Sequence, residues 1–525
     1  MQWALLAIAL VLLNASVTFA NLWPTPWIRI DWAVSIEAVA CVLALAVAGS
    51  RGLLPSTRLL RALACLWVLL VVGRYAEVTT QSLYGRDINL YWDLRNIPDV
   101  SAMLAFVAKP LVLAAVVAGA VLIPLTLYLP VRWALGVVSA AAADAGRRRV
   151  VVGIAGVALM LAALGALTGV EYLPTLPEPM TAVYAQQAAK LAIEMSGAAR
   201  RPVPPAPNLR SNLARVAGAD VFVFFVESYG AVSWERPEFA RALAPARARI
   251  AADIRETHRG VVSAYVTSPT FGGKSWLAHI SLLSGVDVRD EDTNEVLMRQ
   301  PRDTLVTAFR KAGYRTVAMM PGLQHAWPEG AFYGFDEIYG ADRLAYRGPP
   351  FGWWDMTDQF VVARMDALFV APANRQPVFA FLPTISTHAP FTPTPPYEPD
   401  WRRVLTSDPY EQAAVDRAWL DTADWTDLGP GYVHALAYAY QTIGGYLRLR
   451  ADRDFVMILL GDHQPAAAVS GEHASWEVPM HVITSRPDLL DALRARGFRD
   501  GLSPSRPTIG TISDAAPLLL QSFGD

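Results

Sequence analysis

The stretch "DVFVFFVESYG", residues 220–230, has six apolar residues in unbroken succession, followed by a glutamate, Glu227. A strand with one face in water alternates apolar and polar positions, whereas a strand covered on both faces is apolar throughout. Residues 220–226 are therefore predicted to form a central strand of a parallel sheet. Glu227 falls at the carboxyl end of that strand, which is where open sheets of this kind bind ligands.

Five more apolar runs of similar length follow along the chain, and helical patterns separate them. The strand candidates are 261–267, 314–320, 377–384, 454–460 and 478–484, and the helical patterns include 303–313, 358–370, 432–450 and 487–497. Strands that alternate with helices form a mostly parallel sheet with helices on both faces. Residues 218–525 are predicted to be one such α/β domain.

The first third of the chain has a different character. It contains five apolar runs, at 3–21, 32–49, 59–79, 110–129 and 150–170. Each is close to the roughly 20 residues that an α-helix needs to cross a bilayer. A cleaved signal peptide is the alternative for the first run, but a basic segment is missing there and four more runs follow. Residues 1–171 are predicted to form an all-α membrane domain of five transmembrane helices.

Arginines between the apolar runs set the expected orientation. One group lies between the second and third runs and another just before the fifth: Arg51, Arg58 and Arg61, and Arg147, Arg148 and Arg149. Both groups fall on the side of the N-terminus, and the positive-inside rule makes that side cytoplasmic. Five spans then place everything after the fifth run outside the cytoplasm.

Residues 172–217 join the two predicted domains. An amphipathic helix is expected over 181–197, and "RPVPPAPN" (201–208) reads as a proline-rich spacer. The two cysteines, Cys41 and Cys65, both lie in apolar runs, so the later part of the chain has neither a disulfide framework nor a thiolate metal site. A net charge of −2 gives no indication of a nucleic-acid partner.

Ionisable and hydroxyl side chains follow several of the predicted strands. They are Glu227, Lys274 with Ser275, His388, and Asp462 with His463, while His473 precedes the last strand. Carboxyl ends of parallel strands share one edge of a sheet, so these groups are expected to converge. Each residue alone has a plainer interpretation: Ser275 as a helix N-cap, Glu227 as a helix-start carboxylate, the histidines as loop residues.

Together these residue types suit a particular chemistry. Glu, Asp and His supply oxygen and nitrogen ligands for one divalent cation, with manganese expected and magnesium or zinc as alternatives. A serine hydroxyl on such a cation has a lowered pKa and becomes a nucleophile. Ser275 also opens the helical pattern "SWLAHISLLSG" (275–285), and a helix N-terminus favours an anionic phosphate.

With these residues in place, the later domain resembles the alkaline phosphatase/sulfatase superfamily. Together with five spans it looks like the membrane-anchored lipoteichoic acid synthases and phosphoethanolamine transferases. The resemblance implies metal ligands at Glu227, Ser275, Asp462 and His463, the last two in "GDH" (461–463). "GKS" (273–275) resembles the "GKT" that carries their threonine nucleophile. "STHAPF" (386–391) resembles an element whose histidine contacts substrate phosphate, which gives that role to His388.

The sequence also departs from the sulfatase signature. Leu277 and His279 stand where that signature has proline and arginine, so conversion of Ser275 to formylglycine, and with it a true sulfatase, is not expected. Few further carboxylates are visible, which favours one metal. His473, with His481, remains a candidate for a second metal or a phosphate contact. His325, Trp327 and Trp354 are expected to line a headgroup pocket, and 287–296 to be a solvated acidic loop.

The resemblance implies a bacterial inner-membrane enzyme whose catalytic domain is periplasmic or extracytoplasmic. Ser275 would take the headgroup phosphate, phosphoglycerol or phosphoethanolamine, from a phospholipid donor and pass it to a cell-envelope glycan or glycolipid. Lys274 and His388 would steady the phosphate charge. The alternatives are a hydrolase of the same superfamily, such as a phosphodiesterase, and a catalytically silent membrane sensor.

Overall fold

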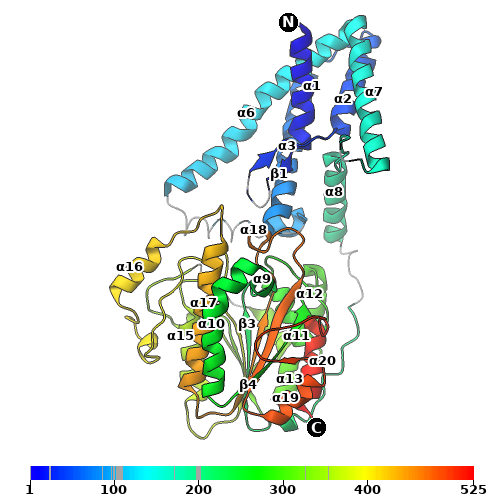
Figure 1. The fold of residues 1–525 in the computed structure, drawn as a ribbon. Helices are drawn as coiled ribbons and strands as arrows, with labels where there is room; N and C mark the ends of the chain where they lie inside the picture. Colours follow the sequence, from blue (N-terminus) through cyan, green and yellow to red (C-terminus); the bar gives the residue numbers. More distant parts are fainter. Residues whose placement is uncertain are drawn as a thin grey trace. The chain divides into compact units, whose positions relative to one another are not determined.

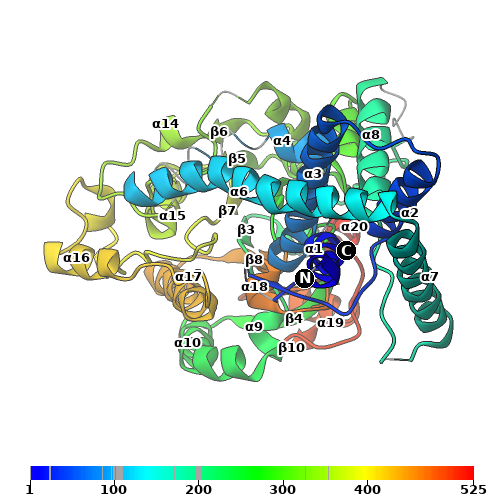
Figure 2. The ribbon, with the colours of Figure 1, turned by 90° about the horizontal axis from the view of Figure 1, so that it is seen from above.

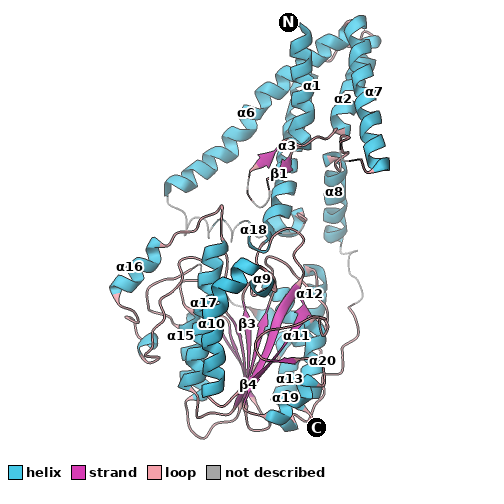
Figure 3. Cartoon of the chain, viewed as in Figure 1, coloured by secondary structure: helices cyan, strands magenta, loops and turns pink. Residues whose placement is uncertain are grey.

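The computed structural model divides the chain into two compact units, Met1–Ala199 and Arg200–Asp525. It describes residues 2–22, 25, 27–84, 87–95, 97, 101, 110–170, 172–196, 203–325, 327–352 and 354–525. Residues 201 and 202 of the predicted proline-rich spacer lie outside this described part. Figure 1 colours the chain along its length and Figure 3 by secondary structure; the first unit is helical and the second combines helices with a sheet.

The first unit consists of helices and one short hairpin. Its elements are α1 (Gln2–Thr18), β1 (Ala20–Asn21), β2 (Ile28–Arg29), α2 (Ile36–Ser50), α3 (Thr57–Tyr84), α4 (Leu90–Arg95), α6 (Pro110–Ala143), α7 (Ala145–Thr168) and α8 (Met180–Ser196). Helix α6 packs against α1, α2 and α3, and α2 packs against α7 (Figure 2). Helices α1, α2, α3 and α7 thus pack on α6, while α8 packs on α3 and α4.

Of the helices described in this unit, three are long and apolar enough to cross a membrane: Thr57–Ser82 within α3, Leu113–Ala143 within α6, and α7. They correspond to three of the five predicted spans. The other two runs form α1 and α2, which are 17 and 15 residues long. At 1.5 Å per residue these fall short of a hydrocarbon core of about 30 Å, which is why length alone separates them from the other three.

The second unit is built on an eight-stranded sheet of order β10-β4-β9-β8-β3-β7-β5-β6. The strands are β3 (Asp220–Val226), β4 (Gly260–Thr267), β5 (Arg315–Met319), β6 (Glu337–Tyr339), β7 (Val378–Pro383), β8 (Phe455–Gly461), β9 (Glu477–Thr484) and β10 (Arg499–Asp500). All six predicted strands are confirmed, each within one residue at either end. The sheet is mixed but mostly parallel, because β9 and β10 run against the other strands.

Helices and short turns connect these strands. They are η1 (Ala214–Val216), α9 (Val232–Glu235), α10 (Pro237–Glu256), α11 (Ser275–Ser284), α12 (Glu291–Met298), α13 (Leu305–Lys311), η2 (Pro328–Tyr333), α14 (Ala341–Leu344), α15 (Asp358–Met365), η3 (Asp366–Val370), η4 (Arg403–Leu405), α16 (Gln412–Leu420), α17 (Gly429–Leu449), α18 (Ala467–Ser470), α19 (Pro487–Arg494) and α20 (Ile512–Phe523).

Both faces of the sheet are covered, which explains the unbroken apolar run of β3. Phe222 and Phe224 lie in one core with residues of α10, α15 and α17, while Val223 and Phe225 lie in the other with residues of α11, α13, α19 and α20. Figures 1 and 3 show these helices on the two sides of the strands. Burying one such side chain stabilises the fold by roughly 1.5–3 kcal/mol, so β3 anchors both layers.

Candidate functional site

Sheet register brings the first two site residues together. β3 and β8 are parallel neighbours in which Val226 pairs with Gly461. The next residue on each strand is a carboxylate, Glu227 on β3 and Asp462 on β8, so the two acids leave the sheet side by side. Both are buried. We refer below to this end of the sheet, where β3, β4, β7 and β8 finish, as the catalytic edge.

The hydroxyl of Ser275 meets these acids from the other side. Its Oγ donates to Oε2 of Glu227 at 2.8 Å and lies 3.2 Å from Nε2 of His463. His463 Nε2 is itself 3.3 Å from Glu227 Oε1 and 3.6 Å from Asp462 Oδ2. All four residues that the sequence placed at metal-ligand positions therefore converge at one point of the catalytic edge.

The tautomer of His463 follows from its second nitrogen. Nδ1 lies 2.7 Å from the backbone oxygen of Gln464, and a carbonyl can only accept, so Nδ1 carries the proton. In the neutral ring, Nε2 then presents its lone pair to Ser275 and the two carboxylates. This is the orientation that a metal-ligating histidine has when its other nitrogen donates to a carbonyl.

The donor set fits a divalent cation. Ligand atoms of Glu227, Asp462 and His463 all lie within 4.8 Å of one another. Asp462 Oδ1 accepts from the backbone N–H groups of Ser228 and His463, at 2.8 and 2.7 Å, whereas the buried Oδ2 has no hydrogen-bond partner within the described part of the chain. Two buried carboxylates, one unpartnered oxygen and one imidazole lone pair are what a hard to borderline cation requires.

The pKa values of Asp462, Glu227 and His463 are shifted by burial and by the charges of these groups on one another. Burial raises the pKa of Asp462 well above its usual range, and the charge of Glu227 adds to that. Burial also acts to raise the pKa of Glu227, but the attraction of His463 outweighs it and the net shift is downward. Burial lowers the pKa of His463, yet the two carboxylates raise it to about 9. The three groups together favour positive charge at their centre.

Three consecutive residues with positive φ precede Ser275 and form the turn that places its hydroxyl beside Glu227 and His463. Gly272, Gly273 and Lys274 have φ values of 67°, 149° and 61°. Glycine adopts such values without strain, which accounts for the two glycines of "GGKS". Lys274 is the N-cap of α11 and Ser275 is its first helical residue. The N-cap interpretation of Ser275 is therefore wrong: its hydroxyl is directed to Glu227 and His463 instead of to the helix backbone.

Lys274 has a partner that the sequence did not predict. Its Nζ lies 2.5 Å from Oε1 of Glu291, and the two side chains are only 15% and 11% exposed. Glu291 belongs to the stretch expected to be a solvated acidic loop. That expectation is wrong for its centre, because residues 291–298 form α12 and Glu291 is buried. A run of acidic residues in a sequence does not indicate which of their side chains will be buried.

A cavity of about 360 Å³ opens beside Ser275. Lys274, Trp327, Trp354 and His388 line it. Trp327 and Trp354 are two of the three residues expected to line a headgroup pocket, and that use of the cavity stays a prediction. The ring of His388 meets that of Trp354 edge-on, with centroids 4.9 Å apart. The remaining wall includes Trp276, Leu283, Asn294, Met298, Met320, Tyr333, Phe335 and Phe381. The cavity is therefore apolar and aromatic away from its catalytic rim.

His279 is the site residue that sequence reasoning assigned no role. It lies one helical turn after Ser275 on α11, lines the cavity, and packs between the rings of Phe225 and Phe381 at 4.7 and 5.4 Å. Its Nε2 is buried without a hydrogen-bond partner among the described residues. Burial lowers its pKa to about 4, so the ring is neutral at neutral pH. The four-residue spacing from Ser275 was the signal available in the sequence.

Three other predicted histidines lie elsewhere. His325 is exposed and is absent from the described cavity wall. The side chain of His473 is 91% exposed, beside Glu472. His481 is fully buried and both its nitrogens are occupied, Nε2 by Tyr229 Oη at 2.9 Å and Nδ1 by Ser263 Oγ at 2.6 Å. The geometry thus brings neither His473 nor His481 to the Glu227 group.

Asp358 connects helix α15 to the loop that carries His388 through hydrogen bonds. This buried residue begins α15, and its Oδ1 accepts from the backbone N–H of Ile385 at 2.7 Å and of Ser386 at 3.3 Å. Asp358 N–H in turn donates to Ser386 Oγ at 3.3 Å. The loop that carries His388 is therefore held by a carboxylate distant in sequence, which no local pattern reveals.

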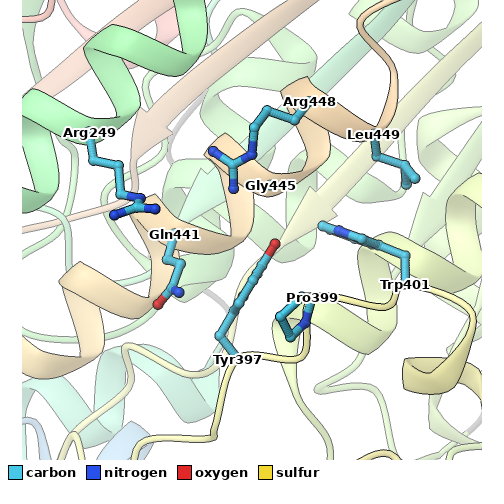
Figure 4. Close-up of a pocket in the computed structure, with 8 residues that line it drawn as sticks. All are labelled: Arg249, Tyr397, Pro399, Trp401, Gln441, Gly445, Arg448 and Leu449. Atoms are coloured by element: carbon cyan, nitrogen blue, oxygen red, sulfur yellow. The ribbon is translucent and has the colours of Figure 1, made fainter.

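A second hollow of about 470 Å³ lies between α10, α17 and the segment around Trp401 (Figure 4). Tyr397, Trp401, Arg249 and Arg448 are among its lining residues. Arg448 forms an ion pair with Asp253 of α10, so its charge is already compensated. None of the predicted site residues lines this hollow, and it is separate from the cavity beside Ser275.

A family model matches part of the second unit of the chain. The family model described as Sulfatase matches residues 221–486, which span the strands from β3 to β9. No curated protein matches the chain.

Several solved structures are similar. The lipooligosaccharide phosphoethanolamine transferase A of Neisseria meningitidis is 15% identical, with a TM-score of 0.45, covering 92% of this chain and 88% of its own. The lipoteichoic acid synthase LtaP of Listeria monocytogenes is 14% identical, with a TM-score of 0.36 and coverage of 64% and 80%. The phosphoglycerol transferase GacH of Streptococcus pyogenes is 13% identical, with a TM-score of 0.36 and coverage of 65% and 81%.

Proposed function

The chain belongs to the sulfatase family of the alkaline phosphatase superfamily, and from that premise we propose that it transfers a phospholipid headgroup phosphate through a covalent intermediate on Ser275. One observation carries the proposal: the Ser275 hydroxyl lies 2.8 Å from Glu227 and 3.2 Å from His463, and Ser275 lines the neighbouring cavity. A structural serine needs one partner, whereas this hydroxyl is placed between a carboxylate and an imidazole. Such placement is typical of an activated nucleophile.

In this proposal Glu227, Ser275, Asp462 and His463 hold one divalent metal ion. Manganese is the expected ion, and magnesium or zinc would suit the same oxygen and nitrogen ligands. When bound, the ion supplies positive charge that lowers the pKa of the serine hydroxyl and offsets the charge of the phosphate.

The first half of the reaction forms one bond and breaks another. Ser275 Oγ, which is hydrogen-bonded to Glu227 Oε2, bonds to the headgroup phosphorus. The phosphorus–oxygen bond to diacylglycerol breaks in line, and the proton that the serine hydroxyl gives up ends on the leaving diacylglycerol oxygen. The headgroup phosphate then remains on Ser275 as a phosphodiester.

The second half reverses these steps with a new partner. A hydroxyl of a glycan or glycolipid bonds to the phosphorus and gives up its proton, and Ser275 Oγ leaves and is protonated again. Water in place of that hydroxyl would make the enzyme a hydrolase. In a silent sensor neither half would run, although the four ligand residues are present and together.

Three further side chains serve binding in this scheme. His388, supported by Trp354, contacts the phosphate, and Trp327 lines the headgroup pocket. The sequence predicted that Lys274 acts on the phosphate charge, but its ion pair with Glu291 favours a different role. Because Glu291 already compensates the charge of Lys274, the lysine acts mainly by holding the turn that presents Ser275. The geometry offers His325 and His473 no comparable part.

The proposal also gives the protein a place in the cell. It is a membrane protein, and its described residues include three helices long and apolar enough to cross a membrane. We propose that α1 and α2 also cross the membrane, which makes five spans with a cytoplasmic N-terminus and a periplasmic or extracytoplasmic catalytic domain. The donor is then a phospholipid of the same membrane, and the domain organisation is 1–171, 172–217 and 218–525.

Intact-mass spectrometry of the full-length protein tests the proposal. The protein is incubated with manganese and either phosphatidylglycerol or phosphatidylethanolamine, and peptide mapping locates any added mass. We expect an adduct on Ser275 that is absent from Ser275→Ala. Release of the adduct by an envelope glycan identifies a transferase, and release by water alone identifies a hydrolase. No adduct with either lipid would overturn the covalent mechanism.

A further inference from the structure

Five exposed apolar side chains of the α/β domain belong to segments at the catalytic edge of its sheet. Among the described residues from 203 onward, the exposed large hydrophobic side chains are Trp276, Trp419, Leu420, Trp425 and Trp476. Four of the five are tryptophans. We call this set the aromatic rim. Such side chains scattered at random over a domain need no explanation, but a group at one place marks an interaction surface.

Two members of the rim, Trp276 and Trp476, lie next to the loop that ends at Ser275. Trp276 follows Ser275, is 43% exposed and lines the cavity. Trp476 immediately precedes β9, whose antiparallel direction puts its first residue at the catalytic edge. The backbone oxygen of Trp476 accepts from Ser268 N–H at 2.8 Å, and its ring packs on Phe271 at 5.7 Å. Both rings therefore border the loop that delivers Ser275.

The other three members lie on the His388 side of the same edge. Trp419 and Leu420 end α16, and the Trp419 ring stacks on buried Phe351 at 6.3 Å, three residues before Trp354 of the cavity wall. Trp425 lies just before α17. The C-terminus of α17 leads into the start of β8, so its N-terminus is at the catalytic edge, and α16 lies beside that end (Figures 1 and 2).

We propose that the aromatic rim docks the catalytic edge onto a bilayer interface. Tryptophan is the residue type enriched at the headgroup level of membranes, because its large ring is apolar while its indole N–H stays hydrated. The first unit contains helices long enough to span a membrane, so the chain that carries the rim is itself held at a bilayer. Docking at this edge presents Ser275 to lipid headgroups.

The charges beside the rim identify the kind of interface. Asp416, Asp421, Asp424 and Asp427 are exposed on and after α16, with Arg417 as the one basic residue of that stretch. These carboxylates would be repelled by an anionic surface, and they complement the outward amines of zwitterionic phospholipids. The partner is therefore a zwitterionic lipid interface, and docking does not require the chemistry at Ser275.

A depth measurement on the full-length protein tests this proposal. Cys41 and Cys65 are replaced by alanine, and a spin label is attached at Leu420→Cys, whose native side chain is 80% exposed. The matched control label is at Asp452→Cys, 72% exposed in the turn before β8 at the opposite edge of the sheet. The protein is reconstituted into phosphatidylcholine vesicles. Collisions with oxygen, which concentrates in lipid, and with a water-soluble nickel chelate are compared by electron paramagnetic resonance.

We expect the label at 420 to collide mainly with oxygen and the label at 452 mainly with the nickel chelate. Trp425→Ser with Trp476→Ser should shift the 420 label toward water. Equal nickel accessibility at both positions would overturn the proposal, and protection of 420 from both reagents would do so too, since it indicates a protein partner. Adding phosphatidylglycerol should not deepen the label; a deeper label would overturn the zwitterionic assignment. Ser275→Ala should leave every result unchanged, so docking and catalysis are tested separately.

Discussion

The Nζ of Lys274, the residue immediately before Ser275, lies 2.5 Å from the Oε1 of Glu291 in a largely buried ion pair. Removing one member of a buried pair leaves an uncompensated charge, which typically destabilises by about 3–5 kcal/mol. We expect Glu291→Gln to lower the melting temperature clearly, and Lys274→Met added to Glu291→Gln to recover much of the loss. Thermal unfolding of the four proteins of this double-mutant cycle measures the coupling.

The same helix offers a matched control for that cycle. Glu295 pairs with Arg299 at 3.1 Å, but these side chains are 47% and 67% exposed. Exposed pairs contribute about 0.3–0.5 kcal/mol, so Glu295→Gln should barely change the melting temperature. Equal effects at 291 and 295 would show that the Lys274 pair does not support the turn before Ser275.

Ser275 is expected to be indispensable for headgroup release. Ser275→Ala removes the atom that bonds to phosphorus, and loss of an enzyme nucleophile lowers kcat by on the order of 10⁴-fold or more. Ser275→Thr keeps a hydroxyl at the same position and should retain measurable turnover. Lipid-headgroup release from mixed vesicles measures both variants, and an alanine variant with wild-type turnover contradicts the nucleophile assignment.

Asp462 is expected to control metal affinity. Its unpartnered Oδ2 faces the other ligands, and Asp462→Asn replaces a carboxylate by a neutral amide. Mutations of groups that merely support a ligand already weaken metal binding by roughly 10–100-fold, so this change should do at least as much. Manganese titration measures it. Asp454→Asn, at the other end of β8 and paired with Arg486, is the control and should bind manganese as the parent does.

His279 should affect function without supporting stability. Its buried Nε2 has no hydrogen-bond partner among the residues that the structure describes, and a buried polar atom without one destabilises the fold. His279→Leu should therefore leave the melting temperature unchanged or raise it. If the headgroup enters the cavity, loss of this hydrogen-bonding group should raise KM for the lipid donor by roughly 3- to 10-fold. A large drop in melting temperature would instead show that the imidazole is part of the packed core.

Asp358 makes stability depend on pH in a defined direction. Burial raises its pKa to about 6 from an ordinary value of 3.8, although backbone N–H groups of the His388 loop oppose the shift. The folded state therefore binds this proton more strongly than the unfolded state. That contribution is fully present below pH 3.8 and is lost as the pH rises through 6. Asp358→Asn removes it.

Melting temperatures across this pH range check the sign. The advantage of the parent over Asp358→Asn should shrink as the pH rises from about 4 to about 6, by roughly 1.4 kcal/mol for each unit of pKa shift. Asp424, which is fully exposed, provides a control substitution whose effect should vary little over the same range. If the melting temperature of the parent instead rose relative to that of Asp358→Asn as the pH increased, the raised pKa of Asp358 would be contradicted.

The sequence by itself determined the elements that depend on local pattern. An unbroken apolar run can only be buried on both faces, so β3 and its neighbours were recognisable from 220–226 and similar runs. Polar residues that follow such runs, directly or one loop later as Ser275 does, fall at one edge. For this reason Glu227, Ser275, Asp462 and His463 could be grouped before any coordinates.

Only the tertiary structure decided which partners these residues have. The pairing of Lys274 with Glu291, the support of the His388 loop by Asp358, and the reversal of β9 each join segments that are separate along the chain. The gathering of four tryptophans at one edge is of the same kind, because residues 276 and 476 become neighbours of one loop only after the sheet forms. Periodicity reports the environment of a residue, whereas a contact depends on chain folding over long separations, which local spacing does not encode.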